Sequence, residues 1–405
     1  MKNLILFDSD VRDQLLPFTY TRPVGEIRIG ILTIREKWER CLKGRVSYIT
    51  QEYLGDKYPI RIEKENYVIN AAILPNKPLC ELIEQLEFNE ALLWKGDLVA
   101  AKFDQEQYKN LMGNEDMQEI SGIEMEGAGA AFTRIESLSD LFRYNEEELR
   151  KDFRMLTQGR TSQPISSTNR VLGEDIFLEE GAIVECATLN ATAGPIYVGK
   201  QAEIMEGAMI RGGLGLCEHA QIKMGAKIYG ATTVGPWCKV GGEVVNSVFF
   251  GYSNKAHDGF LGNSVIGEWC NIGADSNNSN LKNNYEEVRL WNYSTGGFAK
   301  TGTQFCGLFM ADHSKCGINT MFNTGTVIGV SANIFGDGFP RQFVPSFSWG
   351  GANGFSTYKT EKAFQTAEKV MERRGLNLEA QDRLILLRVF EDSAKYRPWE
   401  KKKTT

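Results

Sequence analysis

Apolar residues recur every six positions over much of the second half of the chain. The pattern begins at Leu172, Leu178 and Val184 and returns at Ile266 and Ile272. Its strictest run is Val198, Ile204, Ile210, Leu216, Ile222, Ile228, Val234 and Val240, and a later run is Met310, Cys316, Phe322, Ile328 and Ile334. Neither the helical period of 3.6 nor the strand period of 2 explains a period of six. This hexapeptide repeat predicts a parallel β-helix.

Small or branched side chains follow most of these positions by four residues. Examples are Ala202, Ala208, Ala220, Ala226 and Thr232. We expect each hexad to form one short strand and one turn, with the large aliphatic side chain inside the coil and the small one at a corner. Glycine supplies positive φ where the turns need it. One coil cannot bury its own interior, so the coils must stack, and Cys238, at a repeat position, is expected to be a packing residue.

A different pattern occupies residues 1–155, where short apolar runs alternate with helix-like segments. Strands are expected at "LILF", "VSYIT", "YVINAAIL" and "LVAAKF", and helices at "ILTIREKWERCL", "LCELIEQL" and residues 137–155. This alternation predicts an α/β domain. Polar residues 156–170 are expected to form a linker, residues 171–354 the β-helix, and residues 355–405 two helices that cap the solenoid.

Residues 277–303 interrupt the six-residue period. A long excursion from a solenoid usually serves a function or an interface. Tyr285, Trp291 and Tyr293 need a surface on which to pack. The excursion is therefore expected to be ordered.

Composition narrows the classes of function. The 405 residues carry a net charge of −6, which argues against a nucleic-acid partner. No run of eighteen apolar residues is present, so no membrane span is predicted. The opening "MKNLILFDSDVR" lacks the long apolar run of a secretory signal, which favours a cytoplasmic protein. The eight cysteines never form CxxC and are expected to be reduced thiols.

The segment "NKAHDGFLGNSVIGEWCNIGA" contains His257, one of three histidines in the chain. It resembles the acetyltransferase block of the bifunctional N-acetylglucosamine-1-phosphate uridylyltransferase/glucosamine-1-phosphate acetyltransferase family and its sugar nucleotidyltransferase relatives. The resemblance implies a Rossmann-like nucleotidyltransferase α/β domain followed by a left-handed parallel β-helix. It also implies a homotrimer and an acyl-CoA co-substrate such as acetyl-CoA.

The same resemblance assigns the site residues. His257 falls on the catalytic base, and Glu243 falls on the acid that polarises it. Asn271 and Asn280 fall on sugar-contacting asparagines, and Lys227 takes the place of a phosphate-binding arginine.

Three departures change the groups expected to bind a sugar phosphate, and two of them remove positive charge. Val245 replaces a lysine, Phe260 replaces a tyrosine of the substrate site, and Glu286 stands near the position of a loop lysine. The acceptor is therefore expected to differ from glucosamine 1-phosphate.

Histidine suits base catalysis because it titrates near neutral pH. A lone histidine is also commonly a structural residue, and that alternative stays open for His257. His313, beside Asp312 and Lys315, is a rival candidate, whereas His219 is expected at a solvent-facing corner.

The N-terminal domain departs further from the resemblance. The family's glycine-rich phosphate loop corresponds to a run that has Asp8 and Asp10 in place of glycines. Arg12, Arg22 and Arg28 are the candidate nucleotide-binding cations in this domain. Mg²⁺ is expected if the domain is active.

Two further family positions are changed in this domain. Val24 stands where a lysine is usual, and Asn70 stands where the family has a metal-binding aspartate. The metal ligands therefore stay unassigned.

Three functions remain open. The first is a two-domain transferase of nucleotide-sugar metabolism that acylates a sugar or sugar phosphate. The second is nucleotidyl transfer from a nucleoside triphosphate, with the β-helix as a trimerisation module. The third is a non-catalytic scaffold that binds a nucleotide sugar.

Overall fold

The computed structural model describes residues 1–108, 120–125 and 132–400. The chain forms two compact units. Unit 1 consists of Met1–Leu15, Arg22–Ile27 and Leu32–Glu136, and unit 2 consists of Leu16–Thr21, Arg28–Ile31 and Ser137–Thr405. The boundaries at 155, 170 and 354 stay predictions.

Unit 1 is built on a mixed six-stranded sheet of order β2-β1-β3-β6-β5-β7. Its strands are β1 (Lys2–Phe7), β2 (Gly44–Ile49), β3 (Glu65–Asn70), β5 (Glu90–Trp94), β6 (Asp97–Asp104) and β7 (Ser121–Glu124). The other elements are α1 (Val11–Gln14), η2 (Val24–Glu26), α2 (Ile34–Cys41), α3 (Glu52–Gly55), α4 (Lys77–Glu84) and the pair β4 (Ile73–Leu74) and β8 (Thr133–Arg134). β1 lies between β2 and β3 and is parallel to both. The four expected strands and the first two expected helices are confirmed here, whereas the helix expected at residues 137–155 lies in unit 2 and is divided into two helices.

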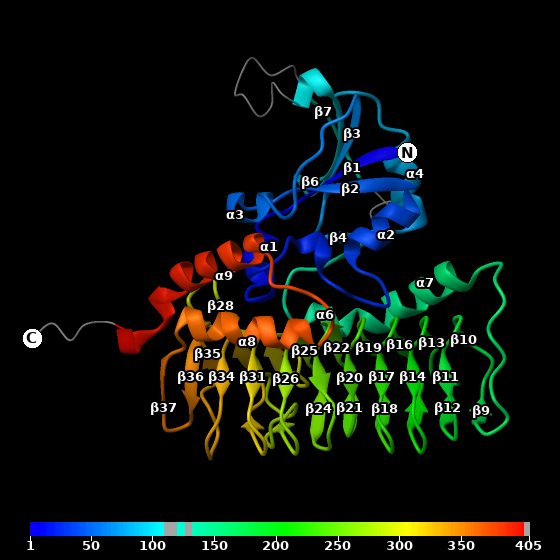
Figure 1. Cartoon of the computed structure of the whole chain (residues 1–405). Coiled ribbons are helices and arrows are strands. Elements are labelled where there is room, and N and C mark those ends of the chain that lie inside the picture. The colour runs from blue at the N-terminus through cyan, green and yellow to red at the C-terminus, as the bar shows by residue number, and fades with distance from the viewer. Residues whose placement is uncertain (109–119, 126–131, 401–405) are drawn as a thin grey trace, which may run out of the picture. The chain divides into compact units, whose positions relative to one another are not determined.

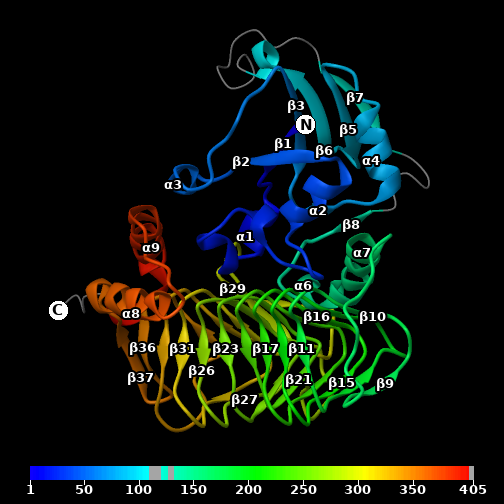
Figure 2. The ribbon, with the colours of Figure 1, turned by 45° about the vertical axis from the view of Figure 1, so that its right-hand side comes forward.

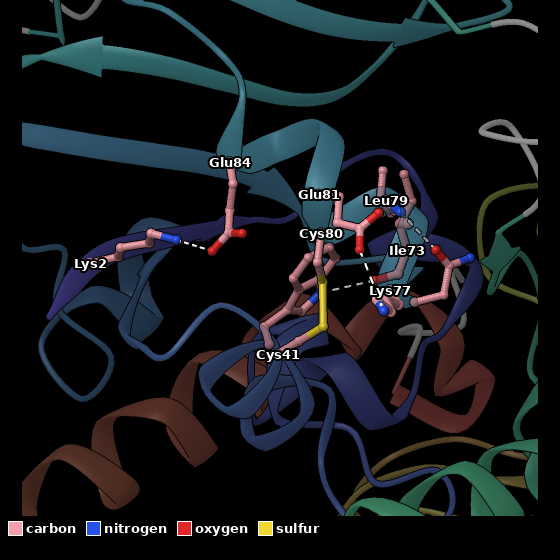
Figure 3. Close-up of a disulfide and its surroundings, with 10 residues drawn as sticks. Lys2, Cys41, Ile73, Lys77, Leu79, Cys80, Glu81 and Glu84 are labelled. Carbon is pink, nitrogen blue, oxygen red and sulfur yellow. Dashed lines mark hydrogen bonds and ion pairs between the residues drawn. A yellow bond between two sulfur atoms is a disulfide. The ribbon is translucent and has the colours of Figure 1, made fainter.

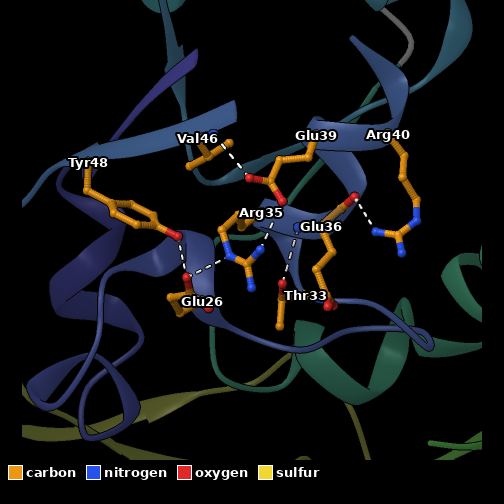
Figure 4. A network of polar contacts seen from close by, with 8 residues as sticks. All are labelled: Glu26, Thr33, Arg35, Glu36, Glu39, Arg40, Val46 and Tyr48. Atoms are coloured by element: carbon orange, nitrogen blue, oxygen red, sulfur yellow. Dashed lines mark hydrogen bonds and ion pairs between the residues drawn. The ribbon is translucent and has the colours of Figure 1, made fainter. Parts of the chain in front are cut away.

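Polar contacts fix α2 within unit 1 (Figure 4). Thr33 and Glu36 form a capping box at its first turn, which satisfies main-chain N–H groups that have no partner within the helix. The Nε of Arg35 donates to Glu26 over 2.8 Å, and the Tyr48 hydroxyl of β2 donates to the same carboxylate. Burial, together with the Glu26 charge, raises the pKa of Tyr48 well above its usual value. Tyr48 therefore stays a neutral donor, and α2 is held to the sheet.

A disulfide joins α2 to α4. Cys41 is the last residue of α2, and Cys80 is the fourth residue of α4. Their Cα atoms lie 6.7 Å apart, and their sulfur atoms are bonded (Figure 3). The expectation that all eight cysteines are free thiols is therefore wrong for this pair. The two cysteines are 39 residues apart and form no CxxC motif. The sequence pattern did not indicate the disulfide, because only the packing of α2 against α4 brings the two side chains together. The other six cysteines are free.

Unit 2 is a stack of coils whose strands form three parallel sheets (Figures 1 and 2). A nine-stranded sheet contains β10 (Ile176–Leu178), β13 (Ile196–Val198), β16 (Leu214–Leu216), β19 (Thr232–Val234), β22 (Val248–Gly251), β25 (Val265–Glu268), β30 (Leu308–Met310), β33 (Thr326–Ile328) and β35 (Phe343–Val344). A ten-stranded sheet contains β11 (Ile183–Val184), β14 (Glu203–Ile204), β17 (Gln221–Ile222), β20 (Lys239–Val240), β23 (Asn254–Lys255), β26 (Asn271–Ile272), β31 (Lys315–Cys316), β34 (Asn333–Ile334), β36 (Ser348–Gly351) and the antiparallel β37 (Gly354–Thr357).

The third face is a six-stranded sheet continued by a separate pair of strands. The sheet contains β9 (Arg170–Leu172), β12 (Thr188–Asn190), β15 (Met209–Arg211), β18 (Lys227–Tyr229), β21 (Glu243–Val245) and β24 (Phe260–Gly262). The pair is β27 (Asn277–Asn278) and β32 (Met321–Phe322). The repeat thus gives a parallel β-helix, and its left-handedness stays a prediction.

The strand register explains where the six-residue period holds and where it fails. Ile196 pairs with Leu214 and Leu214 with Thr232, so each coil there takes 18 residues, which is three hexads. Thr233 pairs with Val248, only 15 residues on. The shortened coil interrupts the period without interrupting the stack.

Across the strictest run, from Val198 to Val240, both positions of each hexad are buried, whereas Leu172, the first position of the predicted pattern, is 48% exposed, so its expected place inside the coil is wrong. Ile204 is 1% exposed and Ala202 is fully buried, and both belong to one continuous apolar core. Cys238 lies in the same core, as its repeat position predicts.

One corner of the β-helix is built from non-glycine residues at positive φ. His219 (φ 55°) stacks on Trp237 (φ 61°) with ring centroids 4.1 Å apart, and Tyr252 stacks on Trp269 at 4.2 Å. Glycine therefore supplies positive φ at some corners, such as Gly225 and Gly242, while ring stacking between coils supports it at this one.

Helices cover parts of unit 2. They are α6 (Asp140–Arg143), α7 (Asn145–Thr157), α8 (Thr360–Glu372) and α9 (Ala380–Asp392), with the short turns η1 (Phe18–Tyr20), η4 (Ala394–Tyr396) and η5 (Pro398–Glu400). The two expected C-terminal helices are confirmed. α8 runs back across the row of coils (Figure 1), and Arg374, just after it, donates to the Trp237 carbonyl and the Asn254 side chain. α8 therefore lies along the coils and not over the last of them.

The excursion is ordered. β28 (Arg289–Asn292) and β29 (Gly297–Lys300) form an antiparallel hairpin. Trp291 stacks on Phe343 with centroids 4.0 Å apart, and Tyr293 meets Phe343 edge to face. Both rings thus find the expected surface on the last coils of their own unit, whereas Tyr285 is 64% exposed.

Candidate functional site

The parallel register of the six-stranded face places three predicted site residues side by side. Lys227 pairs with Glu243, and Glu243 pairs with Phe260, on three consecutive coils. Their strand neighbours Ile228 and Val244 lie in the apolar core. Because side chains alternate along a strand, Lys227, Glu243 and Phe260 point outward. We call these three residues the outer row.

Glu243 has a partner that the sequence did not suggest. The hydroxyl of Tyr229, two residues after Lys227 on β18, donates to Glu243 Oε1 over 2.6 Å. This hydrogen bond to the carboxylate, followed by partial burial, raises the pKa of the tyrosine. Position alone could have indicated Tyr229, because residues i and i+2 of a strand share a face.

His257 lies in the turn between β23 and β24 and is exposed. Its ring makes no hydrogen bond with any residue that the structure describes, so the predicted pairing with Glu243 is not formed within one chain. The turn nevertheless packs closely on the preceding corner. A Cβ built on Gly242 would lie 2.9 Å from the His257 carbonyl oxygen, so the two turns touch through their backbones.

A buried lysine supports the His257 turn from inside the coil. Lys255 pairs with Val240 in the inward-facing row and is 2% exposed. Its ammonium donates to the carbonyls of Gly241 at 3.0 Å and His257 at 2.7 Å. Burial lowers the pKa of Lys255 to about 8, against a smaller opposing effect of Asp258 and Asp275. Sequence reasoning missed this residue because the shortened coil moves it out of the six-residue register.

The other two histidines are corner residues. His313 has φ 60° and a ring 6.3 Å from that of Trp269, and the half-buried Lys315 Nζ donates to its carbonyl at 2.9 Å. His219 stacks on Trp237.

Three asparagines after the His257 turn make side-chain hydrogen bonds within unit 2. The Asn277 side chain accepts from Phe260 N at 2.7 Å, and Asn278 accepts from Gly262 N at 2.9 Å and donates back to its carbonyl. These amides replace the main-chain ladder between β24 and β27. Asn280 donates to Asn263 Oδ1 at 2.8 Å beyond β27.

Asn271 lies apart from this group. It begins β26 on the ten-stranded face and is exposed. The structure therefore brings Asn280 to the side of the outer row and leaves Asn271 on the neighbouring face.

In unit 1, Asp8 is committed to the fold. Its two oxygens accept from Val24 N at 2.9 Å and from the Thr50 hydroxyl at 2.6 Å. Burial raises the pKa of Asp8 to about 6, against the lowering effects of those two bonds and of Arg12. The carboxylate thus ties the end of β1 to η2 and to the residue after β2.

The three candidate cations are divided between the two units. Arg12 is buried and bonds to Asp13 and Tyr53, each within 2.8 Å, and Arg22 is also buried in unit 1. Arg28 belongs to unit 2, where its guanidinium donates to the carbonyls of Phe250 and Ile31. Arg28 therefore holds its segment to the coils.

The residue at the expected metal-binding position of unit 1 is committed to internal hydrogen bonds. Asn70 is 3% exposed, accepts from Ala72 N at 3.0 Å and donates to the Leu98 carbonyl. Within residues 1–108, 120–125 and 132–400, no group of three histidine, cysteine or acidic side chains is arranged to hold a metal ion. We therefore derive no step through a metal.

Comparisons with known proteins bear on the two halves differently. Residues 4–161 match the model of a family described as "Sugar nucleotidyl transferase". No curated protein matches the chain. One similar solved structure is the UDP-N-acetylglucosamine acyltransferase of Arabidopsis, 14% identical, with 59% of this chain and 82% of that chain covered and a TM-score of 0.26. Among the described helices, none has the length and apolar character needed to cross a membrane.

Proposed function

We propose that the chain is a transferase of nucleotide-sugar metabolism whose β-helix moves an acyl group from acyl-CoA to an amine of a sugar or sugar phosphate. The observation that carries this proposal is the outer row, which stands beside the His257 turn on an exposed face of consecutive coils. The acid and the cation of the row, with a base in the neighbouring turn, are the groups that acyl transfer to a phosphorylated amine needs.

The His257 imidazole is the base in this proposal. One ring nitrogen of the imidazole takes a proton from the acceptor amine as the amine nitrogen attacks the thioester carbonyl. The C–N bond forms, the C–S bond breaks, and the coenzyme thiolate leaves and takes up a proton. Glu243 is a positioning residue. Its Oε1 is occupied by Tyr229, while Oε2 bonds to no described residue and can accept the second ring N–H of the imidazole.

Lys227 supplies the positive charge of the row. Its exposed ammonium can pair with an acceptor phosphate, and no described side chain neutralises it. Asn280 can contact a sugar hydroxyl through its amide oxygen, since its amide nitrogen is the atom that bonds to Asn263. In a homotrimer the row would face a neighbouring copy, which would close the site against water.

The test is release of free thiol from acetyl-CoA in the presence of glucosamine or glucosamine 1-phosphate. We expect turnover with at least one amine acceptor. Lys227→Ala should raise KM for the phosphorylated acceptor about tenfold and leave the unphosphorylated one unchanged, because one charge-assisted contact is lost. Absence of thiol release with either acceptor, by folded protein, contradicts the proposal for these acceptors.

Nucleotidyl transfer by the N-terminal half is a second candidate, favoured by the family match over residues 4–161. The commitment of Asp8 and Asn70 to internal hydrogen bonds opposes it. Pyrophosphate release from UTP or dTTP with a sugar 1-phosphate would support this activity. Binding of a nucleotide sugar without turnover of either kind would instead support a scaffold.

A further inference from the structure

A cavity of about 640 Å³ lies at the last coils of unit 2, far along the chain from the outer row. The hairpin β28–β29, the strand β35, the β36–β37 turn and the C-terminal turns η4 and η5 contribute its walls. Small-molecule sites in proteins commonly have volumes of about 300–1,000 Å³. The cavity is therefore large enough for one nucleotide-sized ligand.

Aromatic rings form two parts of the wall. Trp291, Phe343 and Tyr396 make one cluster, in which Trp291 stacks on Phe343 and meets Tyr396 edge to face. Phe355 and Trp399 make the other, with centroids 6.0 Å apart and ring planes within 29°. Trp399 is fixed in place because its Nε1 donates to Thr357 Oγ1 at 2.9 Å. Fixed aromatic faces around one cavity suit a planar ring.

The charged residues that line the cavity are both positive, while the carboxylate of Asp337, outside the lining, accepts from the Asn353 amide at 3.2 Å. Arg341 and Lys395 line it, and no lining residue is acidic. Arg341 is exposed and makes no hydrogen bond or ion pair with a described residue. The main-chain N–H groups of Ala352 and Asn353, in the tight β36–β37 turn, also have no described acceptor. Unpaired cations beside free amide donors favour an anion.

We propose that this cavity binds a nucleoside monophosphate, with the base against the aromatic rings and the phosphate at Arg341. The site is separate from the outer row, so the proposal does not depend on acyl transfer. It predicts that both halves of the ligand contribute to affinity.

The experiment titrates the full chain with AMP, adenosine, inorganic phosphate and glucose 1-phosphate, followed by calorimetry and by quenching of tryptophan fluorescence. We expect AMP to bind most tightly. Arg341→Gln should weaken AMP about tenfold, because a charged hydrogen bond is lost, and leave adenosine unchanged. Phe355→Leu should weaken AMP and adenosine alike.

Arg373→Gln is the matched control, since Arg373 is an exposed arginine that does not line the cavity. It should bind AMP as the wild type does. AMP binding that survives Arg341→Gln and Phe355→Leu unchanged would place the nucleotide elsewhere and overturn the proposal. Two results with folded wild-type protein would overturn it as well: no AMP binding, or tighter binding of glucose 1-phosphate than of AMP. Circular dichroism checks that the wild type and the variants are folded.

Discussion

Replacement of Lys255 by methionine tests how the His257 turn is held. In the folded chain this lysine has a pKa of about 8, lowered by burial from 10.5. The folded state therefore releases the proton between pH 8 and 10.5, whereas the unfolded state keeps it. Between these pH values the unfolded state binds more protons than the folded state, so the free energy of unfolding of the wild type rises with pH.

The size of the effect follows from the shift. Two and a half pKa units correspond to about 3 kcal/mol. Methionine has a similar shape and no charge, so Lys255→Met should lack this rise. The difference in free energy of unfolding, wild type minus variant, should grow by about 3 kcal/mol from pH 8 to 10.5. Hydrogen bonds lost to Gly241 and His257 change the offset between the two curves, not this slope.

Urea unfolding followed by circular dichroism, at half-unit steps of pH, measures the difference. Lys223→Met, a change at a half-buried residue of the preceding corner, is the control and should follow the wild type. Parallel curves for wild type and Lys255→Met would refute the reasoning, because they would mean that the ammonium is solvated in the folded state.

Three other predictions concern contacts that each lie within a single unit. The folded pKa of Asp8 is raised to about 6 because burial of its charge is unfavourable, so the wild type should lose stability as pH rises from about 4 to 6. Asp8→Asn should lack this loss, which urea unfolding of both proteins across this pH interval checks. Arg160→Ala should cost about 1–3 kcal/mol in urea unfolding at pH 7, because Glu179, 5% exposed, would keep only the Tyr197 hydroxyl. Burial alone would raise the pKa of Glu179, but the hydrogen bonds from Arg160 and Tyr197 lower it. The cost of Arg160→Ala should therefore shrink as pH falls below the unfolded pKa of about 4.3, and a cost that does not change with pH would contradict the account. Asn278→Ala should expose the amides of β24 and β27 to faster hydrogen exchange, whereas Asn283→Ala, at an exposed loop position, should not.

The sequence predicted the β-helix because its period records a repeated local requirement. Ile204 and Ala202 are both buried, and the equivalent positions of the other coils face the same core. Each coil therefore needs a large and a small apolar side chain at these positions, which produces the repeat in the sequence. The period fails where coils shorten, as between Thr233 and Val248. That failure concealed Lys255, whose inward position depends on the register of the stack.

The candidate site was predictable only in part. A ladder of parallel strands brings together residues 16 and 17 positions apart, as with Lys227, Glu243 and Phe260, and the resemblance named all three. It did not name Tyr229, which occupies one oxygen of Glu243. It also did not indicate that Asn277 and Asn278 replace main-chain hydrogen bonds, because their role exists only where β24 meets β27. The disulfide between Cys41 and Cys80 likewise depends on how two helices pack.

The central claim is that the imidazole of residue 257 removes a proton during acyl transfer. Its most direct test is the rate of thiol release from acetyl-CoA for His257→Ala beside His219→Ala, a change at a corner histidine that stacks on Trp237. We predict a loss of at least about a hundredfold in kcat for His257→Ala, with its melting temperature unchanged, and wild-type kcat for His219→Ala. Equal turnover by wild type and His257→Ala would contradict the account.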